Sequence, residues 1–266
     1  MITFRKFRAE EVALTHPRLA PGVGPLTFVH LSDLHLRRWG PQHEELSGLL
    51  RERPAHLILF TGDAFTGRRR SAECAARLFS GLRAECGVYA VRGNWDVVYG
   101  PPLRQMRSMM ADWGTRLLVN EGLTVQTAAG PVRVAGLDDP HTGAPDVART
   151  LASADEAPAL SILLSHGAVA ADLLPPGHGV DLLLCGHTHG GQVRVPFWRR
   201  LPYRFYGGMT HGLYQVGPMK LYVNRGFGAV GKVPLRLACP AEVAFFTINA
   251  TGPMGTSTSQ AGEGGG

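Results

Sequence analysis

Short apolar runs alternate with amphipathic segments along the first hundred residues. The apolar runs predict strands at 26–31, 56–60 and 88–91. The segments between them, 42–52 and 71–84, have the pattern of helices covering an apolar surface. The order strand, helix, strand, helix, strand is typical of a parallel sheet covered by helices.

The pattern changes after residue 120. Residues 123–128 and 132–137 alternate around Ala129-Gly130-Pro131, which predicts a hairpin. Residues 160–164 and 181–185 are again short apolar runs. From Gln192 onward, Gly and Pro separate further runs that we interpret as antiparallel strands: 213–216, 220–223 and 241–248.

These elements predict an α/β fold in which two mixed sheets pack together and carry helices outside. The chain has 266 residues, 44% of them hydrophobic, which is enough for a large core. We predict a single domain over residues 1–250. Residues 251–266 are Gly, Ser and Thr with almost no apolar content, so we expect a disordered tail.

Every apolar run in the predicted parallel part ends at a residue type that binds metals. In open α/β sheets, ligands bind at the carboxyl ends of the strands, so these residues should converge on one edge. A single His or Asp at a strand end is usually a turn or cap residue, but five independent endings are hard to explain that way. The five endings are Asp33-Leu34-His35, Gly62-Asp63, Gly93-Asn94, Ser165-His166 and Gly186-His187-Thr188-His189.

The residue types at these endings indicate two transition metals. Imidazole and carboxylate together suit Zn, Fe or Mn better than Ca, which prefers oxygen ligands only. The number of ligands exceeds what one tetrahedral site uses. Paired metals about 3.5–4 Å apart stabilise both the attacking and the leaving oxygen in a displacement at phosphorus. The glycines at 62, 93 and 186 are expected to permit sharp turns and the approach of a phosphate.

The five blocks, in this order, resemble those of the calcineurin-like metallophosphoesterases over about residues 20–248. The longer blocks Ser32-Asp33-Leu34-His35-Leu36 and 186–192 resemble a bacterial branch that acts at or near membranes and includes pyrophosphatases of lipid A precursors. Residues 222–228 and 234–236 also resemble that branch. The resemblance implies a four-layer α/β/β/α sandwich, with two facing mixed sheets and helices on both outer faces.

The resemblance also implies a role for each residue of the blocks. Asp33, His35 and His189 would bind the first metal, and Asp63 would bridge it to the second. Asn94, His166 and His187 would complete the second site. A hydroxide between the two divalent ions would be the nucleophile, since coordination lowers the pKa of water to about 7. We expect the catalytic residues to be Asp63, Asn94, Asp96 and His166.

The block after the third strand departs from the family pattern. It is usually Gly-Asn-His-Asp, and here it is Gly93-Asn94-Trp95-Asp96. The missing His is the residue usually thought to protonate the leaving oxygen, whereas indole can only donate a hydrogen bond. General acid catalysis typically contributes about 10²–10⁴-fold, so poor leaving groups should react slowly. Trp95 itself either packs near the site or lines a substrate groove.

Three accounts of this departure remain open. Another group donates the proton, with Asp96, His141 and His211 as candidates. Alternatively, the natural leaving group is a phosphate and needs less protonation, which is the account we favour. In the third, the protein binds metal and phosphate without turnover. A general nucleotide phosphodiesterase is the alternative within the enzyme class.

The charge of the chain and the arrangement of its aromatic and basic residues limit the kinds of molecule that it is expected to bind. The net charge is +6 and the pI about 9.5, with nearly all of the positive charge from Arg, which favours anionic partners such as phosphates or acidic lipid headgroups. The resemblance implies in addition a phosphorylated small-molecule or lipid-linked substrate. An Arg bias of this kind is also typical of GC-rich genomes. Nucleic acid is not expected, because aromatic and basic residues do not interleave as a single-strand platform. Oligomeric state is left open.

The predicted location is cytoplasmic, with peripheral contact on the inner face of an anionic membrane. No run approaches the roughly 18 apolar residues of a spanning helix, and residues 1–10 lack the apolar region of a secretory signal. Aromatics alternate with Arg and Lys in segments 1–8 and 196–206, a pattern that suits an anionic bilayer surface. These aromatics are Phe4, Phe7, Phe197, Trp198, Tyr203, Phe205 and Tyr206.

Overall fold

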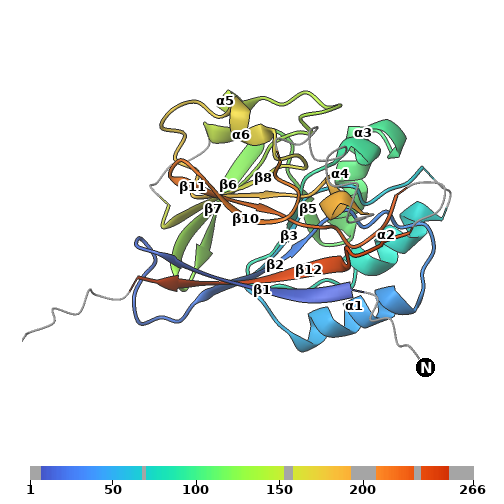
Figure 1. The fold of residues 1–266 in the computed structure, drawn as a ribbon, viewed down its shortest axis with the longest axis horizontal. Helices are drawn as coiled ribbons and strands as arrows, with labels where there is room; N and C mark the ends of the chain where they lie inside the picture. Colours follow the sequence, from blue (N-terminus) through green and yellow to red (C-terminus); the bar gives the residue numbers. More distant parts are fainter. Residues whose placement is uncertain (1–6, 68–69, 153–157, 193–207, 231–234, 252–266) are drawn as a thin grey trace, which may run out of the picture.

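Two six-stranded sheets face each other in the computed structural model (Figure 1), which describes residues 7–67, 70–152, 158–192, 208–230 and 235–251. The first sheet has the order β1-β12-β2-β3-β4-β5 and the second β10-β11-β9-β8-β7-β6. The first contains β1 (Phe7–His16), β2 (Leu26–Leu31), β3 (Leu57–Phe60), β4 (Val88–Ala90), β5 (Thr115–Leu117) and β12 (Ala241–Ala250). The second contains β6 (Glu121–Thr127), β7 (Gly130–Gly136), β8 (Leu160–Leu164), β9 (Leu182–Cys185), β10 (Gly212–Val216) and β11 (Met219–Val223).

Helices cover the outer face of each sheet. Figure 1 shows α1 (Pro41–Glu52) and α2 (Ser71–Phe79) against the first sheet, and α5 (Val147–Leu151) and α6 (Ala170–Leu173) against the second. The remaining helical segments are α3 (Asn94–Tyr99), α4 (Leu103–Asp112) and the 3₁₀ turn His189–Gly191. The predicted four-layer α/β/β/α sandwich of two mixed sheets is therefore confirmed.

Three buried clusters follow from this layering. In β2, Leu26 and Phe28 face the second sheet, whereas Val29 and Leu31 face α1 and α2, as the period of two in a strand requires. Phe28 stacks on Phe246 with ring centroids 4.5 Å apart in the layer between the sheets. A third cluster lies between the second sheet and its helices.

Several element boundaries differ from the sequence predictions. Helix α2 ends at Phe79 rather than at 84, and the amide of Gly81 donates a hydrogen bond to the carbonyl of Leu78 in the turn that follows. The hairpin turn lies one residue earlier than predicted, at Ala128-Ala129, because Thr127 pairs with Gly130. The prediction that the late strands are antiparallel is partly wrong: β11 is parallel to β9, and β12 is parallel to β1.

The first described strand was not predicted. β1 has alternating half-buried and exposed positions and runs parallel to β12 along its full length. Phe7 is only 8% exposed and packs on Phe227 with ring centroids 5.2 Å apart. The prediction that Phe7 contacts a membrane is therefore wrong, since its ring belongs to the core. The other membrane-facing candidates, Phe4 and those in 196–206, lie outside the described residues, as does most of the tail at 251–266.

No helix in the described part of the chain is both long enough and apolar enough to cross a membrane.

Candidate metal centre

The carboxyl ends of five strands from both sheets meet at one edge of the sandwich. Strands β2, β3 and β4 of the first sheet lead into Asp33, His35, Asp63 and Asn94. Strands β8 and β9 of the second sheet lead into His166, His187 and His189. The structure therefore brings all seven predicted metal ligands together, as the strand-end argument required.

The backbone at this edge is held in an unusual conformation. Five of the seven residues are not glycine and yet have positive φ: Asp33 (50°), His35 (41°), Asp63 (62°), His187 (71°) and His189 (50°). The left-handed region costs side-chain-bearing residues of order 1–3 kcal/mol each and is concentrated at functional sites. So many left-handed residues at one edge indicate that the turns after the strands keep a strained backbone in order to direct these side chains into the site.

Asp33 presents one carboxylate oxygen to the site. Its Oδ2 accepts hydrogen bonds from Ser32 Oγ at 2.7 Å and from the His187 amide at 3.0 Å. Its Oδ1 is buried and has no hydrogen-bond donor among the described residues. Three imidazole nitrogens lie within 4.0 Å of Oδ1: Nε2 of His189 at 3.3 Å, of His35 at 3.9 Å and of His166 at 4.0 Å.

Asp63 lies between the two halves of the cluster. Its Oδ1 accepts a hydrogen bond from the Trp95 amide at 2.8 Å. Its Oδ2 is 3.4 Å from Nε2 of His35 and 3.3 Å from Nε2 of His166. One oxygen is thus equidistant from a histidine of each predicted metal, as a bridging carboxylate would be.

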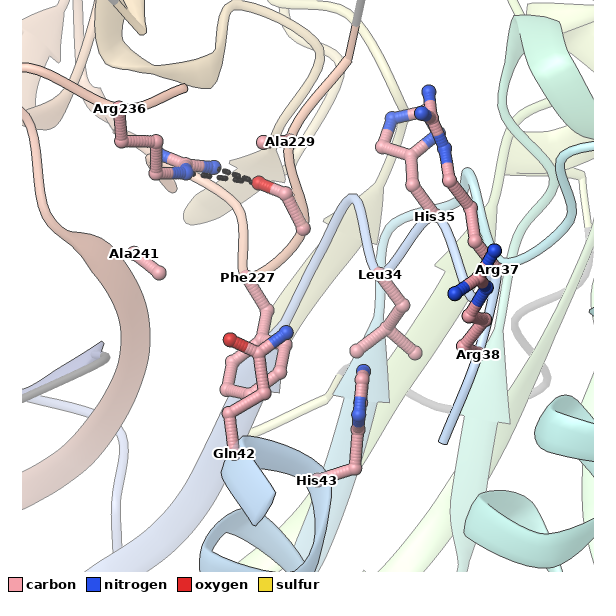
Figure 2. Close-up of a pocket in the computed structure, with 11 residues that line it drawn as sticks. Leu34, His35, Arg37, Arg38, Gln42, His43, Phe227, Ala229, Arg236 and Ala241 are labelled. Atoms are coloured by element: carbon pink, nitrogen blue, oxygen red, sulfur yellow. Dashed lines mark hydrogen bonds between the residues drawn. The ribbon is translucent and has the colours of Figure 1, made fainter. Parts of the chain in front are cut away.

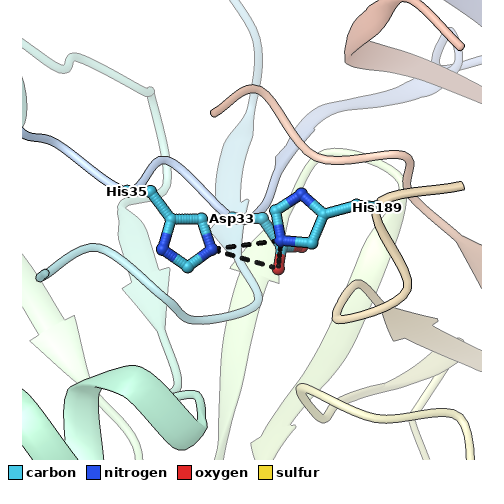
Figure 3. A group of neighbouring side chains, drawn as sticks. All are labelled: Asp33, His35 and His189. Carbon is cyan, nitrogen blue, oxygen red and sulfur yellow. Dashed lines mark hydrogen bonds and ion pairs between the residues drawn. The ribbon is translucent and has the colours of Figure 1, made fainter. Parts of the chain in front are cut away.

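The remaining ligands form a second group at the more open side. Asn94 Oδ1 lies 3.0 Å from His166 Nε2 and 3.1 Å from His187 Nδ1. Asn94 and His187 are partly exposed, whereas the other five ligands are buried. Figure 3 shows the other group, with the rings of His35 and His189 on either side of the Asp33 carboxylate.

A chain of hydrogen bonds holds Asp33 from behind. His30 Nε2 lies 2.9 Å from Thr61 Oγ1, which donates to Ser32 Oγ at 2.8 Å, and Ser32 donates to Asp33. The carbonyl of Thr61 lies 2.7 Å from His166 Nδ1. A carbonyl only accepts, so His166 Nδ1 carries a proton and Nε2 is the nitrogen that faces the site. Partners of this kind fix the orientation and tautomer of metal ligands.

The protonation of the histidines suits a bound cation. Burial lowers the pKa of His35 to about 4 and that of His187 to about 3, and it also lowers the pKa of His189 well below its usual value. Burial acts in the same direction on His166, but the Asp63 and Asp33 carboxylates outweigh it and raise its pKa to about 10. Neutral imidazoles are the form that binds metal, and the carboxylates demand a positive charge at their centre.

These observations show that the residues present fit a metal pair. An orphaned carboxylate oxygen and imidazole nitrogens that face one another are an arrangement that a bound cation would stabilise. Imidazole with carboxylate is the donor set of Zn, Fe or Mn.

Two of the glycines at the strand ends leave room for carboxylates of the site. A Cβ on Gly93 would lie 2.3 Å from Asp63 Oδ1, and one on Gly186 would lie 1.9 Å from Ser32 Oγ and 2.3 Å from Asp33 Oδ2. Both glycines let the backbone approach the two aspartates. The approach of a phosphate at these glycines stays a prediction.

Backbone amides surround the carboxylate of Asp96, one of the predicted catalytic residues. Its two oxygens accept from the amides of Asp63 at 2.6 Å, Gly93 at 2.9 Å and Phe65 at 2.9 Å, and the residue is 2% exposed. Burial, with the Asp63 charge second, raises its pKa to about 7. These bonds tie the turn after β3 to the start of α3, and the catalytic role of Asp96 stays a prediction.

The other proton-donor candidates differ in position. His141 stacks on His187 with ring centroids 4.1 Å apart, and its Nδ1 lies 3.4 Å from Asp139 Oδ1. His211 Nδ1 lies 3.0 Å from Thr210 Oγ1. Trp95, at the position of the missing His, lies edge-on to His35 with ring centroids 5.2 Å apart. His141 is thus beside the second group of ligands and Trp95 beside the first.

Sequence reasoning missed the residues that support the ligands. His30, Ser32 and Thr61 precede the ligands on β2 and β3, and their roles depend on contacts between adjacent strands. The polar Ser32 and Thr61 at the ends of apolar runs were the available signal.

Comparison with known proteins agrees with the fold and the cluster. A family model described as calcineurin-like phosphoesterase matches residues 26–191, a range that contains all seven predicted ligands. The fold and the site are those of a metal-dependent phosphoesterase. The chain belongs to the calcineurin-like phosphoesterase family.

The chain is similar to three bacterial proteins along most of their lengths. It is 33% identical to the uncharacterized metallophosphoesterase YkuE of Bacillus subtilis, over 86% of this chain and 81% of that protein. It is 30% identical to YkoQ of the same organism, also an uncharacterized metallophosphoesterase, over 86% and 85%. It is 28% identical to the phosphodiesterase YaeI of Escherichia coli, over 84% and 82%.

Proposed function

We propose that this protein uses two divalent metal ions to hydrolyse a phosphodiester or phosphoanhydride bond. The observation that carries the proposal is the placement of Asp63 Oδ2, at 3.4 Å from His35 Nε2 and 3.3 Å from His166 Nε2. A single oxygen between two histidines of different strands and different sheets is suited to join two metal positions. The pair, when bound, would lower the pKa of water and offset negative charge on the attacking and leaving oxygens.

We assign the ligands to two positions. Asp33, His35 and His189 would hold one ion, because the Asp33 Oδ1 and the two Nε2 atoms converge on one point. Asn94, His166 and His187 would hold the other, because the Asn94 amide oxygen faces a nitrogen of each histidine. Asp63 would be shared. Manganese, iron and zinc all suit this donor set.

The surrounding residues orient and shield the site. Thr61 fixes the proton of His166 on Nδ1, and Asp96 fixes the amide of Asp63. Burial of five ligands excludes water from one side, so a substrate would enter past the partly exposed Asn94 and His187. Positioning and electrostatic preorganisation are the main contributions a protein makes to phosphoryl transfer.

The substrate we favour has a leaving group that needs little protonation. Trp95 offers no titratable proton beside His35, so a phosphate leaving group, as in a pyrophosphate, fits better than an alkoxide. A lipid-linked nucleotide-sugar pyrophosphate is the finer form of this proposal, supported by the resemblance of residues 186–192 and 222–228 to the lipid A precursor branch. The name of YaeI supports diester hydrolysis as the alternative.

Trp95 also supports a second candidate, a protein that binds metal and phosphate without turnover. Hydrolysis of bis(p-nitrophenyl) phosphate separates the two. We expect turnover with manganese, iron or zinc, its loss on chelation and its return on adding metal back. Stoichiometric metal binding without turnover of any aryl diester or pyrophosphate would favour the second candidate.

A further inference from the structure

Residues 224–228, which we call the clamp loop, follow β11 and pack against the turn after β2. The amide of Gly228 donates to the carbonyl of Asp33 at 2.7 Å. A Cβ on Gly226 would lie 2.6 Å from Cβ of Asp33, so only glycine allows this close approach. The clamp loop therefore fixes the backbone of one predicted metal ligand.

Asn224 anchors the clamp loop to both sheets and is fully buried. Its amide donates to the carbonyl of Cys185 in β9 at 2.8 Å, and its Nδ2 donates to the carbonyl of His30 in β2 at 3.1 Å. Its Oδ1 accepts the amide of Gly226 at 2.7 Å. The loop thus spans the two sheets at the edge where the ligands meet.

Arg236 holds the clamp loop from the side opposite Asp33. Its Nε donates to the carbonyl of Gly228 at 2.8 Å, a contact drawn in Figure 2. Its Nη2 donates to the carbonyls of Arg225 and Gly226 at 2.9 Å each. A planar guanidinium with five N–H groups can hold several carbonyls in one fixed arrangement. With its carbonyls turned toward Arg236, the loop presents the Gly228 amide to Asp33.

The same guanidinium reaches the ligand that follows β9. Arg236 Nη2 lies 3.2 Å from His189 Nδ1, and Nη1 lies 3.5 Å from the His189 carbonyl. Cys239 Sγ donates to that carbonyl at 3.2 Å. These contacts leave Nε2 as the nitrogen that faces the other ligands. With a metal on Nε2 the proton would be on Nδ1, beside the Gly228 carbonyl that Arg236 holds.

We propose that Arg236, acting through the clamp loop, positions the ligands of one metal position and not those of the other. The first position is that of Asp33, His35 and His189, and the second is that of Asn94, His166 and His187. Arg236 acts on Asp33 through the loop and on His189 directly. His166, in the second position, is held instead by the Thr61 carbonyl at 2.7 Å. The inference rests on the proposed function and adds to it a positioning residue that controls one of the two ions.

The charge of Arg236 opposes its positioning role. A guanidinium beside His189 repels a cation at the first position, so removal of the charge alone would tighten that ion. Removal of the hydrogen bonds frees His189 and the clamp loop, and loss of a partner behind a metal ligand typically costs about 10–100-fold in metal affinity. We expect the second effect to dominate, because Arg236 is partly exposed and solvent screens its charge, whereas its hydrogen bonds are direct.

Calorimetric titration of the chelator-treated full chain with manganese tests this proposal in Arg236→Gln and Arg236→Lys. Each change is also made in two backgrounds. Asn94→Ala disables the second position and leaves an ion at the first, whereas His35→Ala does the reverse. The matched control is Arg133→Gln, which removes a buried guanidinium of β7 that donates to two carbonyls at the end of α5.

We expect Arg236→Gln to weaken the ion that remains in Asn94→Ala by about 10–100-fold and to leave the ion that remains in His35→Ala unchanged. Arg236→Lys should lose nearly as much, because one ammonium group cannot replace a planar set of donors. Arg133→Gln should lower the melting temperature of the metal-free protein and still bind both ions as wild type does.

Equal weakening in both backgrounds would mean a general structural defect and would overturn the proposal. Tighter binding at the first position would overturn it as well, because repulsion by the guanidinium would then dominate. So would wild-type affinity in Arg236→Gln, or in Arg236→Lys, where charge without the full set of hydrogen bonds would suffice. If Arg236→Gln does not fold, Arg236→Lys is judged by the same criteria.

Metal content and hydrolysis of the aryl diester in wild type separate this failure from failure of the proposed function. Two ions and turnover, with a first position that is insensitive to Arg236, would mean that the positioning inference is wrong and the phosphoesterase proposal stands. A single ion without turnover in wild type would mean that the proposed function itself is wrong.

Discussion

The Nε2 atoms of His35 and His189 face each other 3.1 Å apart, although 154 positions separate the two residues in the chain. Their rings are nearly parallel, with centroids 5.0 Å apart. Two imidazole lone pairs at this distance repel each other unless a proton or a cation lies between them. Burial lowers both pKa values and so disfavours a charged ring, which leaves a neutral ring with its proton on Nε2, or a bound cation, to satisfy the pair.

Asp63→Asn should weaken both metals at once. The substitution removes the charge of the oxygen that lies between His35 and His166. We expect elemental analysis to give about two ions per chain in wild type and clearly fewer in the variant. Asp112→Asn, at an exposed position on α4, should keep the wild-type content. One tightly held ion in wild type, unchanged by Asp63→Asn, would contradict the dinuclear assignment.

Trp95 should set the preference for leaving groups. With no imidazole at this position, the wild-type rate should fall steeply as the pKa of the leaving group rises. Trp95→His should restore alkyl substrates by about 10–10³-fold and change pyrophosphate cleavage little. The decisive measurement is the rate across a series of aryl and alkyl esters in wild type. A flat dependence would mean that a proton donor such as His141 is already in place.

Thr61→Val should impair both stability and metal affinity. Its hydroxyl joins His30 to Ser32 in the chain of hydrogen bonds behind Asp33. We expect a loss of about 1–3 kcal/mol in the free energy of unfolding and a loss of roughly 10–100-fold in metal affinity. Thr115→Val is the control, because Thr115 Oγ1 is buried without a hydrogen-bond partner among the described residues. That variant should be neutral or stabilising, and an equal loss in both would contradict the prediction.

The metal-free protein should lose stability as the pH falls below about 6.5. Burial lowers the pKa of His30 to about 3, so the folded state binds fewer protons than the unfolded state between these values. The stabilising contribution is fully present above 6.5 and is lost as the pH falls through the window, with a slope of up to about 1.4 kcal/mol per pH unit for one group. His35 and His187 act in the same direction, whereas Asp96, with its raised pKa, opposes them.

His30→Gln isolates the contribution of one histidine. The variant keeps a donor for Thr61 and removes the titration. Urea unfolding in chelator at pH 7 and 5 should show a smaller loss of stability in this variant than in wild type. Equal pH dependence in the two proteins would show that His30 does not contribute.

Weak association with anionic membranes stays a prediction. Its basis is the alternation of aromatic and basic residues in segments 1–8 and 196–206, without Phe7, which belongs to the core. We expect the protein to float with vesicles containing acidic lipid at low salt and to be released at high salt. Vesicles of neutral lipid are the control. Failure to float with acidic vesicles at low salt would count against the idea.

The ligand cluster can be predicted from the sequence because each ligand is marked by the few residues that precede it in the chain. An apolar run followed by Asp, Asn or His marks the carboxyl end of a strand, and parallel strands place those ends together. Leu160–Leu164 followed by Ser165-His166 is the clearest case, with bounds predicted as observed. Nothing more than the run and its last residue is needed there.

The remaining features depend on contacts that no local pattern encodes. β1 alternates half-buried and exposed positions, so its burial depends on β12, more than two hundred residues away. A cavity of about 570 Å³ is lined by residues of the first turn of α1 and by Arg236 from the other end of the chain. Asp96 illustrates the same limit, since only the fold shows three amides around its carboxylate.

The division of the ligands between the two sheets links metal occupancy to mechanical integrity. Asp33, His35, Asp63 and Asn94 follow strands of one sheet, and His166, His187 and His189 follow strands of the other. A bound metal pair would therefore cross-link the two sheets at this edge of the sandwich, and the sheets could not separate there without releasing the ions. Melting temperature should accordingly rise with free metal concentration, and chelation should loosen the two layers at this edge first.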